Sequence, residues 1–191
     1  MQDLILDHIS KSYGELKVLE DLSLKLRAGG RYALMGKSGI GKTTLLRLIL
    51  GLELPNSGVL EPAPGSLRMS VVFQEDRLFP SADAVRNICA ATRGLSADTA
   101  IDALSAIAPD IDIRTPVSDL SGGQRRRVAV LRALLHPSDL LIMDEPFTGL
   151  DTASRQKVLG YIDSHIDGRL FIMSTHDRDD ALKLGCEIIE L

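Results

Sequence analysis

The stretch GKSGIGKT, residues 36–43, sets three glycines in a short loop that ends in lysine and threonine. It follows the strand-like run RYALM, residues 31–35, and leads into the helical pattern TTLLRLILG. Glycines let the backbone curl until successive N–H groups point at one anion, and the helix N-terminus beside them favours negative charge. A strand, such a loop and a helix in this order predict a site for nucleoside triphosphate phosphates within an α/β fold.

Short apolar runs alternate with helical patterns along the chain, which predicts a mostly parallel central sheet. The clearest strands span residues 31–35, 69–73, 139–144 and 169–174. The last three are apolar almost throughout, as is typical of strands that are covered on both faces. The segment 4–26 alternates instead, in DLSLKL for example, and predicts an N-terminal antiparallel β subdomain.

The sequence between Ser81 and Leu120 becomes Ala-rich and predicts helices, with Ser81 and Ser96 as their N-caps. Apolar residues recur there at helical spacing, at Ala100, Ile101, Leu104, Ile107 and Ala108. We expect one domain over residues 1–191, with an α-helical subdomain at about residues 78–135 inserted into its core.

Composition excludes several classes of function. The 22 Lys+Arg against 26 Asp+Glu give a net charge of −4, so no overall positive field attracts nucleic acid. Cys89 and Cys186 are far apart and lack metal-type spacing, which indicates a reducing, cytosolic compartment. No run approaches the ~20 apolar residues of a membrane span, and the first residues lack signal-peptide features. Membrane contact is therefore expected only through a partner.

The glycine-rich loop assigns roles to its own residues. Lys42 is expected to reach the β- and γ-phosphates, and the Thr43 hydroxyl is expected to bind Mg²⁺. A glycine turn without a ligand is the alternative, and the flanking strand and helix argue against it. The predicted nucleotide contacts are Gly36, Lys37, Ser38, Gly39, Ile40, Gly41, Lys42, Thr43 and Thr44.

Polar residues also follow three other predicted strands, at the sheet edge where ligands of open α/β sheets bind. Asp144 is suited to support Mg²⁺, and Glu145 is suited to act as the base that polarises the water attacking the γ-phosphate. Gln74 could bind Mg²⁺ or orient a water molecule. His176 could form a hydrogen bond with the γ-phosphate, or hold Glu145 and the water in place. Each is an ordinary strand-exit residue when taken alone, and only their common location predicts a site.

Taken in order, these motifs resemble those of the ATP-binding subunits of ABC transporters, and the resemblance extends over residues 4–191. They are KSYG with Tyr13, the Walker A loop at residues 36–43, Gln74 of the Q-loop, LSGGQ at residues 120–124, Walker B at residues 140–144, Glu145, the D-loop GLD that ends at Asp151, and His176. The resemblance implies a P-loop NTPase with a RecA-like core, ATP and Mg²⁺ as cofactors, and ATP hydrolysis that drives a translocase.

The resemblance also implies partners. Tyr13 is expected to stack on adenine, and a second copy or a paralogous ATPase is expected to complete each site head to tail. Each ATP then lies between the Walker A loop of one chain and the signature of the other. The expected contacts are Ser121, Gly122, Gly123 and Gln124 of the signature and Asp151 of the D-loop. The residues agree in part, since SGGQ before a helix offers a hydroxyl, unhindered N–H groups and a helix N-terminus but no lysine.

The stretch STHDRDDALKL resembles a pattern of importer subunits, and VFQEDRLFP resembles the corresponding stretch of nitrate, sulfonate and taurine importer ATPases. Import through transmembrane permease subunits is therefore expected, at the inner face of the plasma membrane and on its cytoplasmic side. Leu78, Phe79 and Val85 are suited to contact such a permease, or equally to be local core. The D-loop reads TGLD where SALD is the commonest form, and with fifteen residues after His176 no C-terminal regulatory domain is expected.

Two alternative functions account for less of the sequence. A soluble ABC-type ATPase acting on DNA or ribosomes normally carries a coiled-coil insert, a tandem domain or basic arms. A P-loop small-molecule kinase leaves LSGGQ, Asp151 and His176 without a role.

The three arginines after the signature, Arg125, Arg126 and Arg127, lie about 100° apart on a helix. With the apolar stripe of Val128, Leu131, Leu134 and Leu135, they predict an amphipathic helix with a solvated basic end.

Overall fold

A five-stranded parallel sheet runs through the centre of the computed structural model, which describes residues 2–166 and 168–191. Its strands, in spatial order, are β5 (Met69–Val72), β6 (Leu140–Asp144), β7 (Leu170–Ser174), β3 (Arg31–Met35) and β8 (Glu187–Glu190). The four predicted strands are confirmed to within one residue at each end. The edge strand β8, which is short and half exposed, has no counterpart in the prediction.

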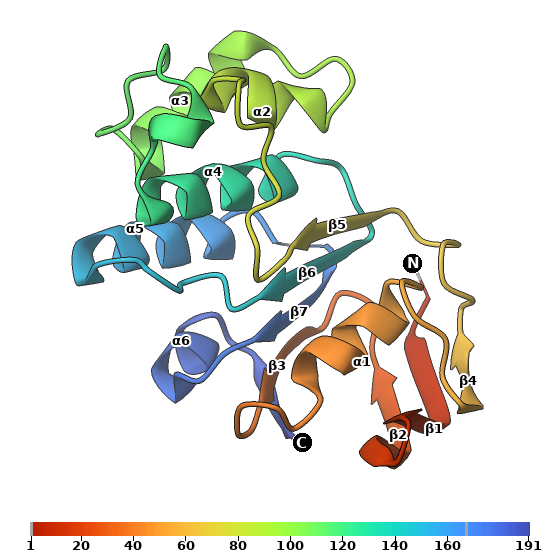
Figure 1. Ribbon diagram of the computed structural model, residues 1–191. Helices are drawn as coiled ribbons and strands as arrows, with labels where there is room; N and C mark the ends of the chain where they lie inside the picture. Colours follow the sequence, from red (N-terminus) through yellow and green to blue (C-terminus); the bar gives the residue numbers. More distant parts are fainter. Residues whose placement is uncertain (1, 167) are drawn as a thin grey trace.

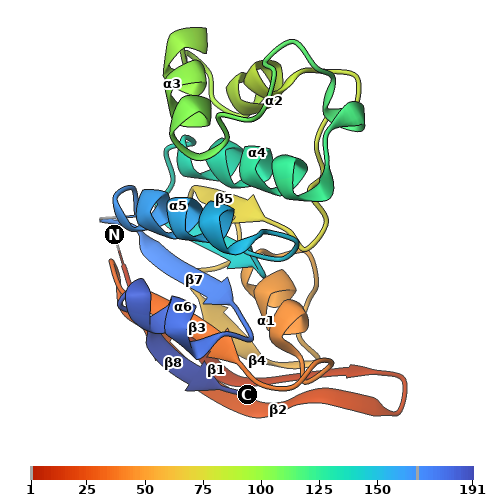
Figure 2. The ribbon, with the colours of Figure 1, turned by 90° about the vertical axis from the view of Figure 1, so that its left-hand side faces the viewer.

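Helices cover both faces of this sheet, which is why the central strands β6 and β7 are apolar up to the polar residue that ends each (Figure 2). Leu140 and Ile142 of β6 pack into the core formed with α1 (Lys42–Ile49). Leu141 and Met143 point the other way, into the core that includes α5 (Thr152–Asp163) and α6 (Arg178–Lys183). Successive side chains of a strand alternate between faces, so both faces need apolar residues here.

A three-stranded antiparallel sheet lies beside α1, at the lower right of Figure 1. It consists of β1 (Leu4–Tyr13), β2 (Leu16–Leu26) and β4 (Ser57–Glu61), in the order β2-β1-β4. The predicted N-terminal antiparallel subdomain is therefore confirmed. Its third strand comes from beyond α1 in the sequence, which only the tertiary structure reveals.

The remaining helices gather over the β5 edge of the parallel sheet (Figure 1). They are α2 (Ala84–Ala90), α3 (Ala97–Ile107), the 3₁₀ turn η1 (Val117–Asp119) and α4 (Gly122–Leu134). Among the described residues, none of these or the other helices combines the length and apolar character that crossing a bilayer demands.

One of the two predicted helix caps in this region is correct. Ser96 caps α3 by accepting a hydrogen bond from Thr99 N at 3.1 Å. Ser81 is wrong as a cap, because α2 begins two residues later, where the Asp83 side chain accepts from Arg86 N at 2.8 Å. The buried Asn87 side chain bonds to the loop residues before Asp83, and this holds them outside the helix.

The predicted solvated basic end of α4 is also wrong. Arg126 is 2% exposed and Arg127 is 6% exposed, because the surrounding elements cover α4 at its start as well as along its apolar stripe. Arg127 donates to both carboxylate oxygens of Asp110, at 2.5 and 2.7 Å. The stripe itself is confirmed, since Val128, Leu131 and Leu134 are buried and Leu135 is half-buried.

Candidate functional site

The phosphate loop, residues 36–43, connects β3 to α1 as predicted. Gly41, the residue before the helix, has φ 116°, and a Cβ there would lie 3.1 Å from the Val18 carbonyl oxygen. Gly36 has φ 141°, and a Cβ there would lie 2.9 Å from the carbonyl oxygen of Leu191. An L side chain rarely adopts such φ values, so both positions require glycine for the loop to curl.

Lys42 places its charge inside this loop. The residue is 6% exposed, and its Nζ donates to the carbonyl oxygens of Gly36, at 2.9 Å, and Lys37, at 3.0 Å. Two of the three ammonium donors thus hold the side chain over the loop. The loop rim is exposed, at Lys37, Ser38, Gly39 and Ile40, and Thr43 and Thr44 are half-buried at the start of the helix.

The Asp144 carboxylate, 6% exposed, is held between two hydroxyl groups at the carboxyl edge of the sheet. Thr43 Oγ1 donates to Asp144 Oδ2 at 2.9 Å, and Ser174 Oγ donates to Asp144 Oδ1 at 2.5 Å. Sequence reasoning missed Ser174. It faces Asp144 across the β6–β7 register, and a register between distant strands is not visible in the sequence.

The donor set around Asp144 fits a magnesium ion. Thr43, Gln74 and Asp144 line one cavity of about 400 Å³, and all three offer oxygen atoms. Mg²⁺ prefers oxygen ligands and is usually held by one or two carboxylates together with substrate phosphates and water. Within the described residues no group of three or more His, Cys, Asp and Glu could hold a metal unaided. An ion that takes phosphate and water oxygens does not need one.

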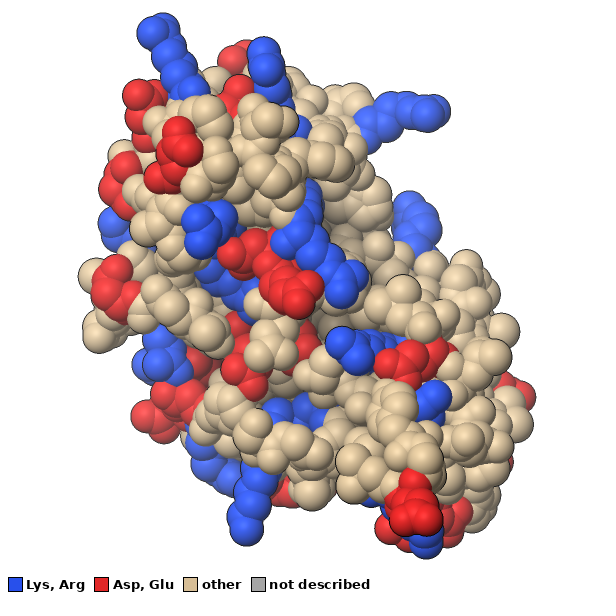
Figure 3. Space-filling model, viewed as in Figure 1, with Lys and Arg blue, Asp and Glu red and all other residues tan. Residues whose placement is uncertain are grey.

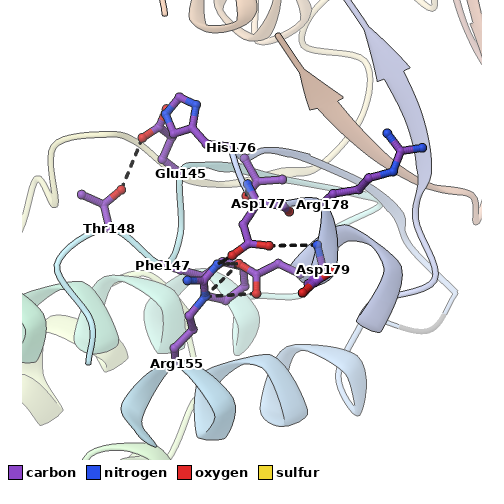
Figure 4. Close-up of a pocket in the computed structure, with 10 residues that line it drawn as sticks. Glu145, Phe147, Thr148, Arg155, His176, Asp177, Arg178 and Asp179 are labelled. Atoms are coloured by element: carbon purple, nitrogen blue, oxygen red, sulfur yellow. Dashed lines mark hydrogen bonds and ion pairs between the residues drawn. The ribbon is translucent and has the colours of Figure 1, made fainter. Parts of the chain in front are cut away.

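Glu145 and His176 lie side by side in a second cavity of about 510 Å³ (Figure 4). His176 Nε2 is 2.6 Å from Glu145 Oε1, and Thr148 Oγ1 donates to Glu145 Oε2 at 3.3 Å. The side chain of Glu145 is 21% exposed and that of His176 is 57% exposed. The structure therefore brings together two residues that follow different strands, and both reach solvent.

The backbone of Glu145 is strained. Its φ of 51° lies in the left-handed region, which a residue with a Cβ adopts only at a cost. Its N–H donates to Ser174, at 3.0 Å to the hydroxyl and 3.2 Å to the carbonyl oxygen. The bend directly after β6 thus depends on bonds from neighbouring segments.

A charged cluster lies at the opposite end of the same cavity, below His176 in Figure 4. Arg155 Nη2 donates to Asp177 and Asp180 at 2.5 Å each, and Asp180 raises the pKa of the guanidinium. The pKa of Asp177 is lowered by the backbone N–H of Asp179 and by Arg155. The cluster ties α5 to the segment that carries His176, and the sequence analysis did not identify it.

The signature segment, residues 120–124, begins α4 with a capping box. Ser121 Oγ accepts from Gln124 N at 3.2 Å, and Gln124 Oε1 accepts from Ser121 N at 2.9 Å. Gln124 Nε2 donates to Asp110 Oδ2 at 3.1 Å, so the glutamine side chain serves the fold. The groups left for an anion are the Ser121 hydroxyl proton and the backbone N–H groups of the glycines.

The signature segment packs against the D-loop, residues 149–151. A Cβ at Gly123 would lie 2.9 Å from the Gly149 carbonyl oxygen, so no larger residue fits there. Asp151 caps α5 by accepting from Ser154 N at 2.9 Å, a bond that lowers the Asp151 pKa. Both segments line a cavity of about 500 Å³ that shares no residue with the cavities at Glu145 and Asp144.

Two predicted residues remain, Tyr13 and Gln74, and both are exposed. Tyr13, at the end of β1, is 44% exposed, and its hydroxyl donates to the Glu53 carboxylate and lowers the pKa of Glu53. The Lys11 Nζ lies 5.2 Å from the centre of the Tyr13 ring. Gln74 is exposed beside Thr43 and Asp144, where its side chain can reach a ligand of either residue.

Comparisons with known proteins agree with this geometry. The family model described as ABC transporter matches residues 19–148. The aliphatic sulfonates import ATP-binding protein SsuB 1 of Rhodococcus jostii is 37% identical over 188 residues, which cover 96% of this chain and 76% of the relative. The Nod factor export ATP-binding protein I of Cupriavidus pinatubonensis is 39% identical, over 95% of this chain and 61% of that protein.

A solved structure extends the likeness to the fold. It is the dimeric ATP-binding cassette MJ0796 in a post-hydrolysis state with ADP and Pi, which superposes with a TM-score of 0.83 at 25% identity. The superposition covers 98% of this chain and 94% of that one. The central sheet, the antiparallel sheet and the helices described above therefore form the arrangement seen in a nucleotide-binding protein.

Proposed function

The chain belongs to the ABC transporter family, and from this premise we propose that it is the ATPase subunit of an importer that powers separate transmembrane permease subunits. One observation carries the proposal. A complete phosphate-binding and catalytic surface and a separate signature surface lie on the same chain without sharing a cavity. Such a chain can bind ATP at one surface and complete the ATP site of another molecule with the other.

We propose that Glu145 is the general base of hydrolysis. The phosphate loop and Lys42 hold the phosphates, and Mg²⁺ at Thr43, Gln74 and Asp144 would neutralise part of their charge. A water attacks the γ-phosphate as the bond to the β-phosphate oxygen breaks, and Glu145 takes the proton of that water. His176, 2.6 Å from Glu145 Oε1, holds the carboxylate in position.

We propose that the working unit is a head-to-tail pair with a second copy of the chain or a paralogue. The signature segment has no lysine in its cavity, and the arginine that lines this cavity, Arg127, is paired with Asp110. It can therefore bind a phosphate but cannot hold a nucleotide alone. ATP shared between the two chains favours the closed pair and hydrolysis releases it, so the cycle is driven by different affinities in two states.

We propose that the permease docks beside the Gln74 segment, residues 73–76, on the helical subdomain at about residues 78–135. A cavity of about 340 Å³ there is lined by Asp76, Leu78, Pro80, Val117 and Arg125, among others. Phe79 is 58% exposed, whereas Leu78 and Val85 are half-buried against the core. Of the three apolar residues, Phe79 is thus the best placed for a partner, and this contact would hold the chain at the cytoplasmic face of the membrane.

Import is the direction we propose, because the sulfonate relative is an import protein by name and covers more of both chains. The exporter relative makes export the second candidate. Action on nucleic acid is not favoured, since positive and negative side chains are interspersed over the face in Figure 3. Vesicles that contain the chain with its permease decide the direction: accumulation of solute on the side opposite the ATPase would overturn the import proposal and favour export.

The substitution Glu145→Gln tests the catalytic proposal. It removes the base but keeps the size of the side chain, so we expect ATP hydrolysis to fall at least ~100-fold, as is typical of a lost general base. ATP binding should persist, and a dimer should appear on size-exclusion chromatography with ATP. The matched control is Glu187→Gln, an exposed position on β8, which should behave as wild type. Hydrolysis by Glu145→Gln at the wild-type rate would eliminate Glu145 as the base.

A further inference from the structure

Arg126 is a buried cation whose role the proposed function leaves open. It lies in the second turn of α4, and its side chain is 3% exposed. Its carboxylate neighbour is Asp76, which Nη1 reaches at 3.3 Å. Burial lowers the pKa of the guanidinium, and Asp76 opposes that shift. A charge placed this deeply must be compensated by many well-made hydrogen bonds.

Those bonds go to the backbone of two segments that are far apart in the sequence. On one side, Nη1 donates to the carbonyl oxygens of Phe73, at 2.5 Å, and Gln74, at 3.4 Å. On the other side, Nη2 donates to the carbonyl oxygens of Asp144, at 2.5 Å, and Glu145, at 2.6 Å. The planar guanidinium thus joins the Gln74 segment to the end of β6.

The bonds fall where the backbone needs support. Glu145 has the left-handed φ of 51°, and Arg126 Nε also donates to the next carbonyl oxygen, that of Pro146, at 3.3 Å. Carbonyl oxygens in this bend cannot pair within a strand, so a fork of fixed donors is suited to hold them. Lysine carries the same charge on a single nitrogen and has no such fork.

The position of Arg126 on α4 links it to the other half-site. Gly123, whose N–H belongs to the signature surface, lies one helical turn earlier on the same helix. A shift of the α4 N-terminus therefore moves Arg126, and Arg126 contacts the backbone of both Glu145 and Gln74. In the head-to-tail pair, the signature surface contacts the ATP that the partner binds, whereas Glu145 and Gln74 act on the ATP that this chain binds.

We propose that Arg126 is a positioning residue that couples the signature surface of this chain to its own Glu145 and Gln74. ATP brought to the signature by the partner orders α4, and Arg126 transmits that order to the base that hydrolyses the chain's own ATP. The proposal rests on the head-to-tail pair described above. It predicts that Arg126 acts on the hydrolytic rate and on cooperativity between sites, not on binding of ATP by the single chain.

The substitution Arg126→Gln tests this coupling in the full chain. We expect kcat for ATP hydrolysis to fall about tenfold or more, equivalent to one or two lost hydrogen bonds. The Hill coefficient should fall to about 1, the value for independent sites. The Kd of the single chain for a fluorescent ATP analogue should stay within about twofold of wild type. Arg126→Lys should not restore kcat, because the fork is lost, and full restoration would overturn the proposal.

The matched control is Arg169→Gln. Arg169 also donates to backbone carbonyl oxygens, those of Leu134 at 2.8 Å and His165 at 2.7 Å, but it contacts neither Glu145 nor the Gln74 segment. Loss of an arginine that bonds to backbone carbonyl oxygens would by itself lower the melting temperature of both variants and leave the Hill coefficient unchanged. An equal loss of kcat and cooperativity in Arg169→Gln would therefore overturn the coupling role of Arg126.

A second background separates this proposal from the proposed function. In Glu145→Gln, the added change Arg126→Gln should still permit the ATP-dependent dimer, since the phosphate loop and signature contacts remain. Absence of the dimer in Glu145→Gln itself contradicts the head-to-tail pair. A dimer in both backgrounds, together with unchanged cooperativity in Arg126→Gln, contradicts only the coupling role.

Discussion

The phosphate loop and the signature segment both precede a helix and are both rich in glycine, yet they present different chemistry. At the phosphate loop, Lys42 donates to the loop carbonyl oxygens, and Thr43 donates to Asp144 beside a cavity that both of these residues line. At the signature segment, the charged and polar side chains of Gln124 and Arg127 turn inward to Asp110. The first presents a lysine and a carboxylate suited to hold a nucleotide with Mg²⁺, and the second presents a backbone surface suited to complement such a site in another chain.

The largest effect should follow from removing Lys42, the buried cation of the phosphate loop. Lys42→Ala deletes the charge that the loop carbonyls hold in place. Charged hydrogen bonds contribute about 1.5–3 kcal/mol, so ATP should bind about 100-fold more weakly by isothermal titration calorimetry. Lys17→Ala, an exposed position on β2, is the control. Unchanged ATP affinity in Lys42→Ala would remove the difference between the two regions.

A smaller effect, limited to the pairing of two chains, should follow from Gly123→Ala. The new Cβ meets the backbone carbonyl oxygen of Gly149 at 2.9 Å, which is too close to keep, so the signature segment or the D-loop must shift. ATP affinity of the single chain should persist, while hydrolysis falls about tenfold because the second half-site is misplaced.

The control for Gly123→Ala is Gly160→Ala inside α5, where a Cβ meets no atom within 4 Å. That substitution should raise the free energy of unfolding by about 0.5–1 kcal/mol, through helix propensity. If Gly123→Ala weakens ATP binding by the single chain as well, the two surfaces are not separable.

The smallest effect concerns the ion pair between Arg127 and Asp110, and it is measured as the pH dependence of folding stability. Arg127 lowers the pKa of Asp110 to about 2. A lowered carboxyl pKa stabilises the folded state above the ordinary value of ~3.9, and this stabilisation is lost as pH falls toward about 2. Asp110 is 50% exposed, so screening limits the effect to about 1 kcal/mol or less.

The variant Asp110→Asn should therefore melt below wild type at pH 7, and the difference should vanish as pH falls from ~4 to about 2. Thermal unfolding followed by circular dichroism measures it. A difference that persists at the lowest pH would show that the Asp110 charge does not stabilise the signature end of the molecule.

Local patterns were sufficient to predict four of the five strands of the central sheet and the polar residues at their ends. RYALM before GKSGIGKT located the phosphate loop, and LLIMDEP located Asp144 and Glu145 at a strand end. Capping signals were less reliable, because Ser81 carries the right side chain but Asn87 holds its backbone outside the helix. Ser174 and Arg155 escaped notice, since their partners are 30 and 25 residues away in the sequence.

The sequence by itself was sufficient to predict which segments are suited to bind phosphate, because glycine spacing, a following helix and an adjacent lysine act within a few residues. It also showed that the signature motif LSGGQ contains no lysine or arginine. Only the tertiary structure decided the direction of the three arginines. Their surroundings come from β5, β6 and the neighbouring helices, and burial among distant backbone carbonyls turned Arg126 from a surface charge into a contact between two segments of the site.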